Sequence, residues 1–320
     1  GRIYVVSSTT NYGVISLNRD GSFNGFIGPQ KVTIDAWDYF WRMFQTAEQR
    51  RSNIQYVPTE YNNLTIDSDG FLYVTTSSID AEQQQAAITS RSTADTYAPV
   101  KKLNPSGSDV MNRNGFFPPS GEVGVGNKDI TITGASTIVD VALGPNGMWS
   151  IIDQKRSKVF TYDANGVLLF AFGDMGDQVG NIQNLQAIAY QGSNILLLDS
   201  TNNTITVYKR TAYGDLIASA LQNTEDQNYD AAVNYYTAIL QRNNNYDSAY
   251  VGIGQSLYRD GEYLQAMQYF KYAYDTENYS EAYSAYRKEW VEKYVILIPI
   301  IIVAVCVLIS WFFRHAKKVN

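Results

Sequence analysis

Apolar and polar residues alternate in short runs from Gly1 to about Arg210, and this period of two predicts antiparallel β-strands. Turn residues interrupt the runs at four places, where we expect two-residue hairpin turns: Asp69-Gly70, Asn146-Gly147, Asn165-Gly166 and Gly192-Ser193. Gly147 and Ser193 lie 46 positions apart, close to the roughly 40 to 45 residues of a four-stranded propeller blade. Residues 1–210 are therefore predicted to form about four blades or partial blades of a β-propeller.

Two segments depart from this strand pattern. In residues 35–51, large aromatics recur at i, i+3, i+4 and i+7, which is one face of a helix: Trp37, Phe40, Trp41 and Phe44. Such a helix covers an apolar flank of its own propeller, closes the propeller mouth or docks a partner protein, so these four residues are docking candidates. Residues 77–98 are polar without a strong period, and we expect an excursion that carries a short helix.

From residue 211 to 293 the pattern becomes helical and repeats every 34 positions, which is the tetratricopeptide period. Tyr229 and Tyr263 are separated by this distance, and so are Ala232 and Ala266. Small residues at repeat positions let paired helices approach closely. Because fewer than three full repeats are present, we expect a spacer or docking platform, with these further docking candidates: Tyr250, Tyr258 and Tyr274.

The twenty residues from Tyr294 to Phe313 contain no charge, and at about 1.5 Å rise per residue they are long enough to cross a bilayer. We predict a single transmembrane helix at 294–313 and a short tail at 314–320. Basic residues flank both ends, and the denser cluster is on the C-terminal side: Arg314, Lys317 and Lys318. This cluster favours a cytoplasmic tail in a single-pass protein of the cell membrane, with the soluble domains extracytoplasmic.

Composition narrows the possible chemistry. The net charge of -6, with 31 acidic against 25 basic residues, argues against nucleic acid as a partner. The only cysteine is Cys306 and the only histidine is His315, so catalytic triads, Cys/His dyads and His-ligated zinc cannot form within residues 1–293. Carboxylates, lysines, tyrosines, hydroxyls and a hard cation such as Ca²⁺ remain. The opening GRIYVV has the pattern of a strand within a fold, so we expect further blades and a targeting signal before Gly1.

The segments LTIDSDGFLYVTT (64–76) and LQAIAYQGSNILLLDSTNNTITVYKR (185–210) resemble NHL-type β-propeller repeats, and Asp153 and Asp199 stand at the turn aspartate of that repeat. For these aspartates we predict a capping role. The segment NYDSAYVGIGQSLYRDGEYLQAMQYFKYAY (245–274) resembles a tetratricopeptide repeat. With the apolar C-terminal segment, this domain order resembles the membrane-anchored NHL and tetratricopeptide repeat proteins of Gram-positive Firmicutes. The resemblance implies association with carbohydrate-type ABC importers and supplies no catalytic residues.

We therefore predict a non-enzymatic extracytoplasmic scaffold or receptor subunit without a cofactor, whose partners are the permease and substrate-binding subunits of an ABC importer. Two alternatives stay open. A calcium-dependent lactonase or lyase would hold Ca²⁺ with Asp, Asn and Glu side chains near a propeller channel. A glycan-binding protein would stack carbohydrate on strand aromatics such as Trp149, Tyr162 and Phe172, although those residues also fit a hydrophobic core.

Overall fold

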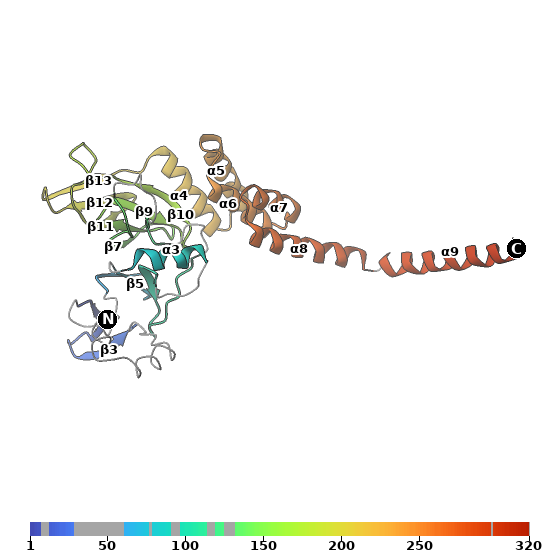
Figure 1. Ribbon diagram of the computed structural model, residues 1–320, viewed down its shortest axis with the longest axis horizontal. Helices are drawn as coiled ribbons and strands as arrows, with labels where there is room; N and C mark the ends of the chain where they lie inside the picture. The colour runs from blue at the N-terminus through green and yellow to red at the C-terminus, as the bar shows by residue number, and fades with distance from the viewer. Residues whose placement is uncertain are drawn as a thin grey trace, which may run out of the picture. The chain divides into compact units, whose positions relative to one another are not determined.

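The computed structural model describes residues 1–7, 13–28, 61–76, 79–90, 97–113, 119–124, 132–295 and 297–319. The chain divides into two compact units, Gly1–Arg210 and Thr211–Asn320. In the described residues, the first unit is built mainly of strands and the second of helices, as Figure 1 shows. The predicted order of a β region followed by an α region is therefore confirmed.

The described strands of the first unit form four antiparallel sheets, each made of strands that follow one another in the chain. The first sheet holds β1 (Arg2–Val5), β2 (Val14–Asn18) and β3 (Phe23–Ile27), and the second holds β4 (Asn63–Ile66), β5 (Leu72–Thr75) and β6 (Val100–Leu103). The third holds β7 (Ile138–Leu143), β8 (Trp149–Asp153), β9 (Lys158–Tyr162) and β10 (Leu168–Phe172). The fourth holds β11 (Leu185–Gln191), β12 (Asn194–Asp199) and β13 (Thr204–Tyr208).

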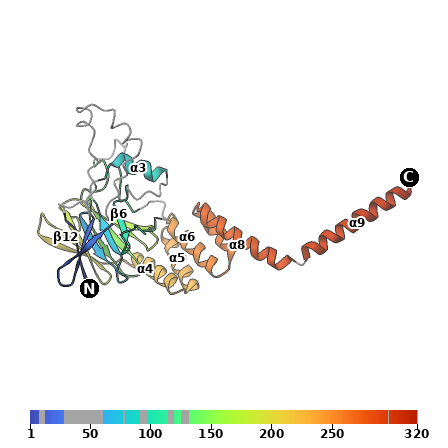
Figure 2. The ribbon, with the colours of Figure 1, turned by 90° about the horizontal axis from the view of Figure 1, so that it is seen from below.

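Neighbouring sheets pack face to face in chain order. Successive side chains of a strand point to opposite faces, so a strand that is buried throughout must be covered on both sides. In β5, Leu72 and Val74 pack against the first sheet while Tyr73 packs against the third. In β8, Ile151 faces the second sheet and Ile152 faces the fourth. This succession of sheets is propeller-like, and Figure 2 shows the same strands turned by 90°.

Several of the hairpins close through a four-residue turn that begins at an Asp or Asn and ends at a glycine. At two of them the predicted turn was wrong. The turns at Asp69-Gly70 and Asn165-Gly166 are not two-residue turns, because each begins two residues earlier at an aspartate, Asp67 or Asp163. The Asp67 backbone N–H donates to the Phe71 carbonyl, and its Oδ1 accepts from the backbone N–H groups of Asp69 and Phe71. Gly70 then takes a φ of +87°, which suits a glycine-closed bulge.

Of the other two predicted turns, Gly192-Ser193 forms as expected and Asn146-Gly147 lies in a loop that is one residue longer. Asn146 and Gly147 both have positive φ, 56° and 67°, and the Met148 N–H donates to the Pro145 carbonyl across them. The Gly144 N–H donates to the Met148 carbonyl, so Pro145 also belongs to the loop. Gln191 pairs with Asn194, which leaves the predicted pair at 192–193 as the turn. The short helix expected within 77–98 is also present, as α3 (Ala81–Thr89), and the Asp80 side chain caps it by accepting from the Gln83 N–H at 2.8 Å. The helix predicted at 35–51 lies outside the described residues.

The second unit begins with a run of antiparallel helices at the predicted repeat positions: α4 (Ala212–Glu225), α5 (Tyr229–Arg242), α6 (Asp247–Arg259), α7 (Tyr263–Tyr272) and α8 (Thr276–Tyr294). Small residues allow the close approach that the repeat pattern predicts. A Cβ added to Gly252 would lie 2.4 Å from the Tyr236 ring, and one added to Gly254 would lie 2.5 Å from the Phe270 ring. Ala232 and Ala266, which are one repeat apart, are both fully buried.

The apolar C-terminal segment differs from the single helix that the sequence predicts. The predicted span at 294–313 is divided, because α8 ends at Tyr294 and α9 (Leu297–Val319) begins three residues later. Among the described residues, no helix by itself has the length and apolar character needed to cross a membrane. The helix Thr276–Tyr294 and the segment Pro299–Trp311, bent by 64°, meet that requirement as a pair by length and composition alone.

Candidate functional site

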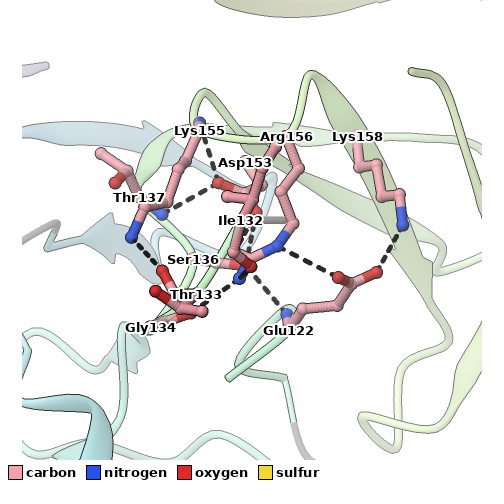
Figure 3. Close-up of polar contacts among 10 residues, drawn as sticks. All are labelled: Glu122, Ile132, Thr133, Gly134, Ser136, Thr137, Asp153, Lys155, Arg156 and Lys158. Atoms are coloured by element: carbon pink, nitrogen blue, oxygen red, sulfur yellow. Dashed lines mark hydrogen bonds and ion pairs between the residues drawn. The ribbon is translucent and has the colours of Figure 1, made fainter. Parts of the chain in front are cut away.

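A dense polar network of the first unit surrounds Asp153, at the end of β8 (Figure 3). The Asp153 side chain is fully buried. Its Oδ1 accepts from the backbone N–H groups of Thr137, at 2.9 Å, and Lys155, at 3.0 Å. Its Oδ2 accepts from the Ser136 hydroxyl at 2.7 Å and from Arg156 at 3.0 Å. The predicted capping role of this aspartate is therefore confirmed.

Arg156 extends the network to neighbouring segments. Its side chain is only 4% exposed, yet each of its three nitrogens, Nε, Nη1 and Nη2, has a hydrogen-bond or ion-pair partner. Nε pairs with Glu122 at 3.1 Å, and Nη2 donates to the carbonyls of Ile132, at 3.1 Å, and Gly134, at 2.7 Å. Glu122 also pairs with Lys158 at 2.6 Å. Because the guanidinium and the Asp153 carboxylate are occupied by one another and by the backbone, this network holds segments together.

Asp199 has the corresponding place at the end of β12. Its carboxylate accepts from the backbone N–H groups of Gln183, at 2.9 Å, and Thr201, at 2.9 Å. Burial opposes ionisation of Asp199, but the backbone N–H groups that it accepts from outweigh burial, so its pKa is lowered. The predicted capping role is confirmed here too.

A third aspartate joins three sheets, and the sequence analysis missed it. Asp140 lies on β7, beside β4 on one side and β11 on the other. Its Oδ1 accepts from the Asn63 side-chain amide of β4 at 2.8 Å, and its Oδ2 accepts from the Ile188 N–H of β11 at 2.8 Å. Burial raises the pKa of Asp140, while backbone donors partly offset this. The signal in the sequence was an acidic residue within an otherwise apolar strand, VDVAL.

A cavity of about 330 Å³ opens between the second and third sheets. It is lined by side chains from β5, β6, β8 and the adjoining loops: Phe71, Tyr73, Lys102, Val110, Met111, Asn112, Trp149 and Ala164. The cavity is partly open to solvent, and its lining combines aromatic and aliphatic side chains with Lys102 and Asn112. Its volume lies at the lower end of the range of small-molecule sites. Trp149 and Tyr73 form part of the wall, with ring centroids 5.8 Å apart.

Lys102 is the charged residue of this lining. Its ammonium lies 4.7 Å from the ring centroid of Phe71 and 5.1 Å from that of Tyr73, and it pairs with Asp67 at 3.3 Å. Burial acts to lower the pKa of Lys102, but hydrogen bonding and charge interaction with Tyr73 and Asp67 outweigh it and raise the pKa. The cavity therefore presents a permanent positive charge at neutral pH. The sequence analysis did not single out Lys102 or Phe71, because they meet only through strand pairing.

The strand aromatics considered for glycan stacking belong largely to the core. Trp149 is 2% exposed and stacks on Tyr162, with centroids 4.8 Å apart. Tyr162 is also buried, and Phe172 packs against Tyr208 at 5.0 Å. The core interpretation of Trp149 and Tyr162 is confirmed. Within the part of the chain that the structure describes, no group of three or more His, Cys, Asp or Glu residues is arranged to hold a metal ion.

The predicted docking tyrosines of the second unit differ in how freely their rings are presented. Tyr250 and Tyr258 are half-buried, and their hydroxyls donate to the Asn244 carbonyl and to Glu281, at 3.1 and 3.2 Å. Tyr274 follows α7 and is 91% exposed. A docking role for these three tyrosines stays a prediction. The other docking candidates lie outside the described residues: Trp37, Phe40, Trp41 and Phe44.

No protein-family model matches the chain, and no curated protein matches it by sequence. Solved structures similar to it include a catalytically inactive virginiamycin B lyase from Staphylococcus aureus with quinupristin, at 14% identity and a TM-score of 0.35. A streptogramin B lyase structure is similar at 12% identity and a TM-score of 0.31. Each match covers 65% of this chain and about half of the other, 52% and 51%. Likenesses of this size carry no conclusion about activity.

Proposed function

We propose that the protein is a non-enzymatic scaffold subunit that its C-terminal apolar helix anchors in a cell membrane. One observation carries this proposal: every side chain from Pro299 to Trp311 of α9 is exposed, and none carries a charge. An apolar surface of this length on all faces of a helix needs a cover, which lipid or the helices of a membrane partner would supply. Together with α8, this segment has the length and composition to span a bilayer.

The helical unit supplies surfaces suited to a protein partner. Tyr274 is 91% exposed and Tyr272 is 60% exposed, and tyrosine is among the residues enriched at the energetic centres of protein interfaces. The resemblance to membrane-anchored repeat proteins of Firmicutes supports an ABC importer as this partner, with carbohydrate as its cargo. In this proposal residues 1–293 are extracytoplasmic and the tail at 314–320 is cytoplasmic.

Membrane anchoring is tested with two charges placed in the middle of α9. The double variant Val303→Asp and Val307→Asp puts two like charges at bilayer depth, where each costs about 2.5 to 3.5 kcal/mol on the insertion scale and neither can pair with the other. We expect the full chain to move from the membrane pellet to the supernatant after ultracentrifugation. The control is Leu264→Asp, at an exposed position of α7, which leaves α9 unchanged. Membrane retention of the double variant equal to that of the control would contradict anchoring by α9.

The partner is tested in native membranes by site-specific photo-crosslinking from position 274. Permease or substrate-binding subunits of an ABC importer should be captured there, and not from position 241, which is exposed near the end of α5. The variant Tyr274→Ala should also reduce the amount of importer that copurifies with the full chain. Equal capture from positions 241 and 274 would argue against docking through this tyrosine.

A further inference from the structure

We propose that the cavity between the second and third sheets of the first unit binds a small monocarboxylate that has an apolar body. The site is distinct from the surfaces that the scaffold proposal uses, and it would function with or without a membrane partner. It is formed by Phe71, Tyr73, Lys102, Met111 and Trp149, with Ala164 at its rim.

Charge selects the ligand class. Among the residues that the structure describes, the ammonium of Lys102 is the charged group in the lining, and no acidic side chain lines the cavity. Asp67 pairs with this ammonium at 3.3 Å, and since an ammonium has three N–H donors, a ligand oxygen can accept from another of them. Hydrogen bonds between an ammonium and a carboxylate are stronger than those to a neutral hydroxyl. A cationic ligand would instead meet like charge from Lys102.

Size and lining describe the remainder of the ligand. At about 30 Å³ for each molecule of liquid water, the cavity corresponds to roughly eleven non-hydrogen atoms. Apart from Lys102 and the Asn112 amide, its walls are aromatic and aliphatic, from Tyr73 and Trp149 on the strands and from Val110 and Met111 on the segment after β6. Apolar walls of this kind favour a compact ring or branched chain over a polyol, because a polyol would leave hydroxyl groups without partners. An arylacetate fits these requirements.

The Asp67 carboxylate sets the position of the Lys102 ammonium without closing the cavity. Asp67 lies 3.3 Å from Nζ but is not part of the lining, and the rings of Phe71 and Tyr73 flank the same ammonium. Its carboxylate is already held by the turn, because Oδ1 accepts two backbone N–H groups. The positive charge is therefore fixed in place before a ligand arrives, which reduces the entropy lost on binding.

The test uses the full chain in detergent and three probes that share a phenyl ring: phenylacetate, 2-phenylethanol and phenethylammonium. Binding is measured by isothermal titration and by saturation-transfer NMR. We expect phenylacetate to bind at least about tenfold more tightly than either other probe, since a hydrogen bond to a charged group is at stake. Phenylacetate that binds no better than the alcohol, or not at all at millimolar concentration, would overturn the proposal, and so would preference for the ammonium probe.

Variants place the binding at this cavity. Lys102→Met should weaken phenylacetate binding at least tenfold and leave 2-phenylethanol unaffected, and Lys102→Arg should restore part of the preference for the acid. Ala164→Leu narrows the rim from an exposed turn position without touching the charge, and it should weaken both probes. The control is Lys209→Met, which removes an exposed lysine that does not line the cavity. Equal phenylacetate affinity in Lys102→Met, Ala164→Leu and the control would refute a site here.

Discussion

Replacing Arg156 by methionine should destabilise the first unit more than any change at an exposed charge of the same network. Methionine retains much of the apolar stem but removes every donor of the guanidinium. The carboxylates of Asp153 and Glu122 and two backbone carbonyls then lose a partner. Asp153 is fully buried and cannot recover these interactions from water, whereas Glu122 is 41% exposed and can.

The magnitude follows from this difference in burial. Removing one partner of a buried ion pair costs about 3 to 5 kcal/mol, because the remaining charge stays buried without compensation. The matched control is Lys158→Met, which removes the other partner of Glu122. Lys158 is 34% exposed and its ion pair reaches solvent, so we expect a loss of about 1 kcal/mol or less. Both substitutions remove one positive charge; Arg156 differs from Lys158 in its burial and in the two backbone carbonyls that it also holds.

Urea unfolding followed by tryptophan fluorescence measures both effects, because Trp149 lies in the core of the first unit. Whole domains are stable by about 5 to 15 kcal/mol, so the expected loss is a large fraction of the total. The urea concentration at the unfolding midpoint should therefore be much lower for Arg156→Met than for the wild type. The reasoning would be refuted if Arg156→Met and Lys158→Met lowered the unfolding free energy by the same amount. It would also fail if Arg156→Met cost less than about 1 kcal/mol, the range of exposed pairs.

Two further predictions concern contacts between secondary-structure elements: Asp140 between sheets and Gly254 between helices. Burial raises the pKa of Asp140, so its ionised form disfavours the fold, and stability is lost as pH rises from the ordinary carboxyl pKa through the raised one. Asp140→Asn cannot titrate, and its NH2 replaces one of two accepting oxygens, so a donor then faces either the Ile188 N–H or the Asn63 and Val141 donors. The variant should be less stable than the wild type by about 1 to 3 kcal/mol. Calorimetry should show this difference in stability shrinking as pH rises, and a growing difference would contradict the assignment. Gly254→Ala would place its Cβ 2.5 Å from the Phe270 ring and should lower the thermal midpoint of the second unit through about 1 to 3 kcal/mol of overpacking, whereas Gly261→Ala, which meets no atom within 4 Å, should show only the smaller strain of its positive φ.

The local structure of this protein could be predicted from the sequence, because it depends on periods of two and of about four residues. Alternation predicted the strands around Asn146-Gly147 and Gly192-Ser193, and the 34-residue repeat predicted the paired helices on either side of Gly261. The predicted two-residue turns at Asp69-Gly70 and Asn165-Gly166 were wrong, because these turns begin at Asp67 and Asp163. Their aspartates cap backbone N–H groups two and four residues ahead, which lengthens each loop.

Contacts between residues far apart in the chain were decided only by the tertiary structure. Asp140 joins Asn63 to Ile188. Arg156 contacts Glu122 and the Gly134 carbonyl in the same way, through separations that no sequence period encodes. The Lys102 cavity arises in the same way, because sheet packing brings β6 and β8 together. The sequence by itself determined which faces are apolar, because burial of apolar surface drives folding without regard to direction. Only the packed structure determined which polar groups meet, because hydrogen bonds and ion pairs require specific distances and directions.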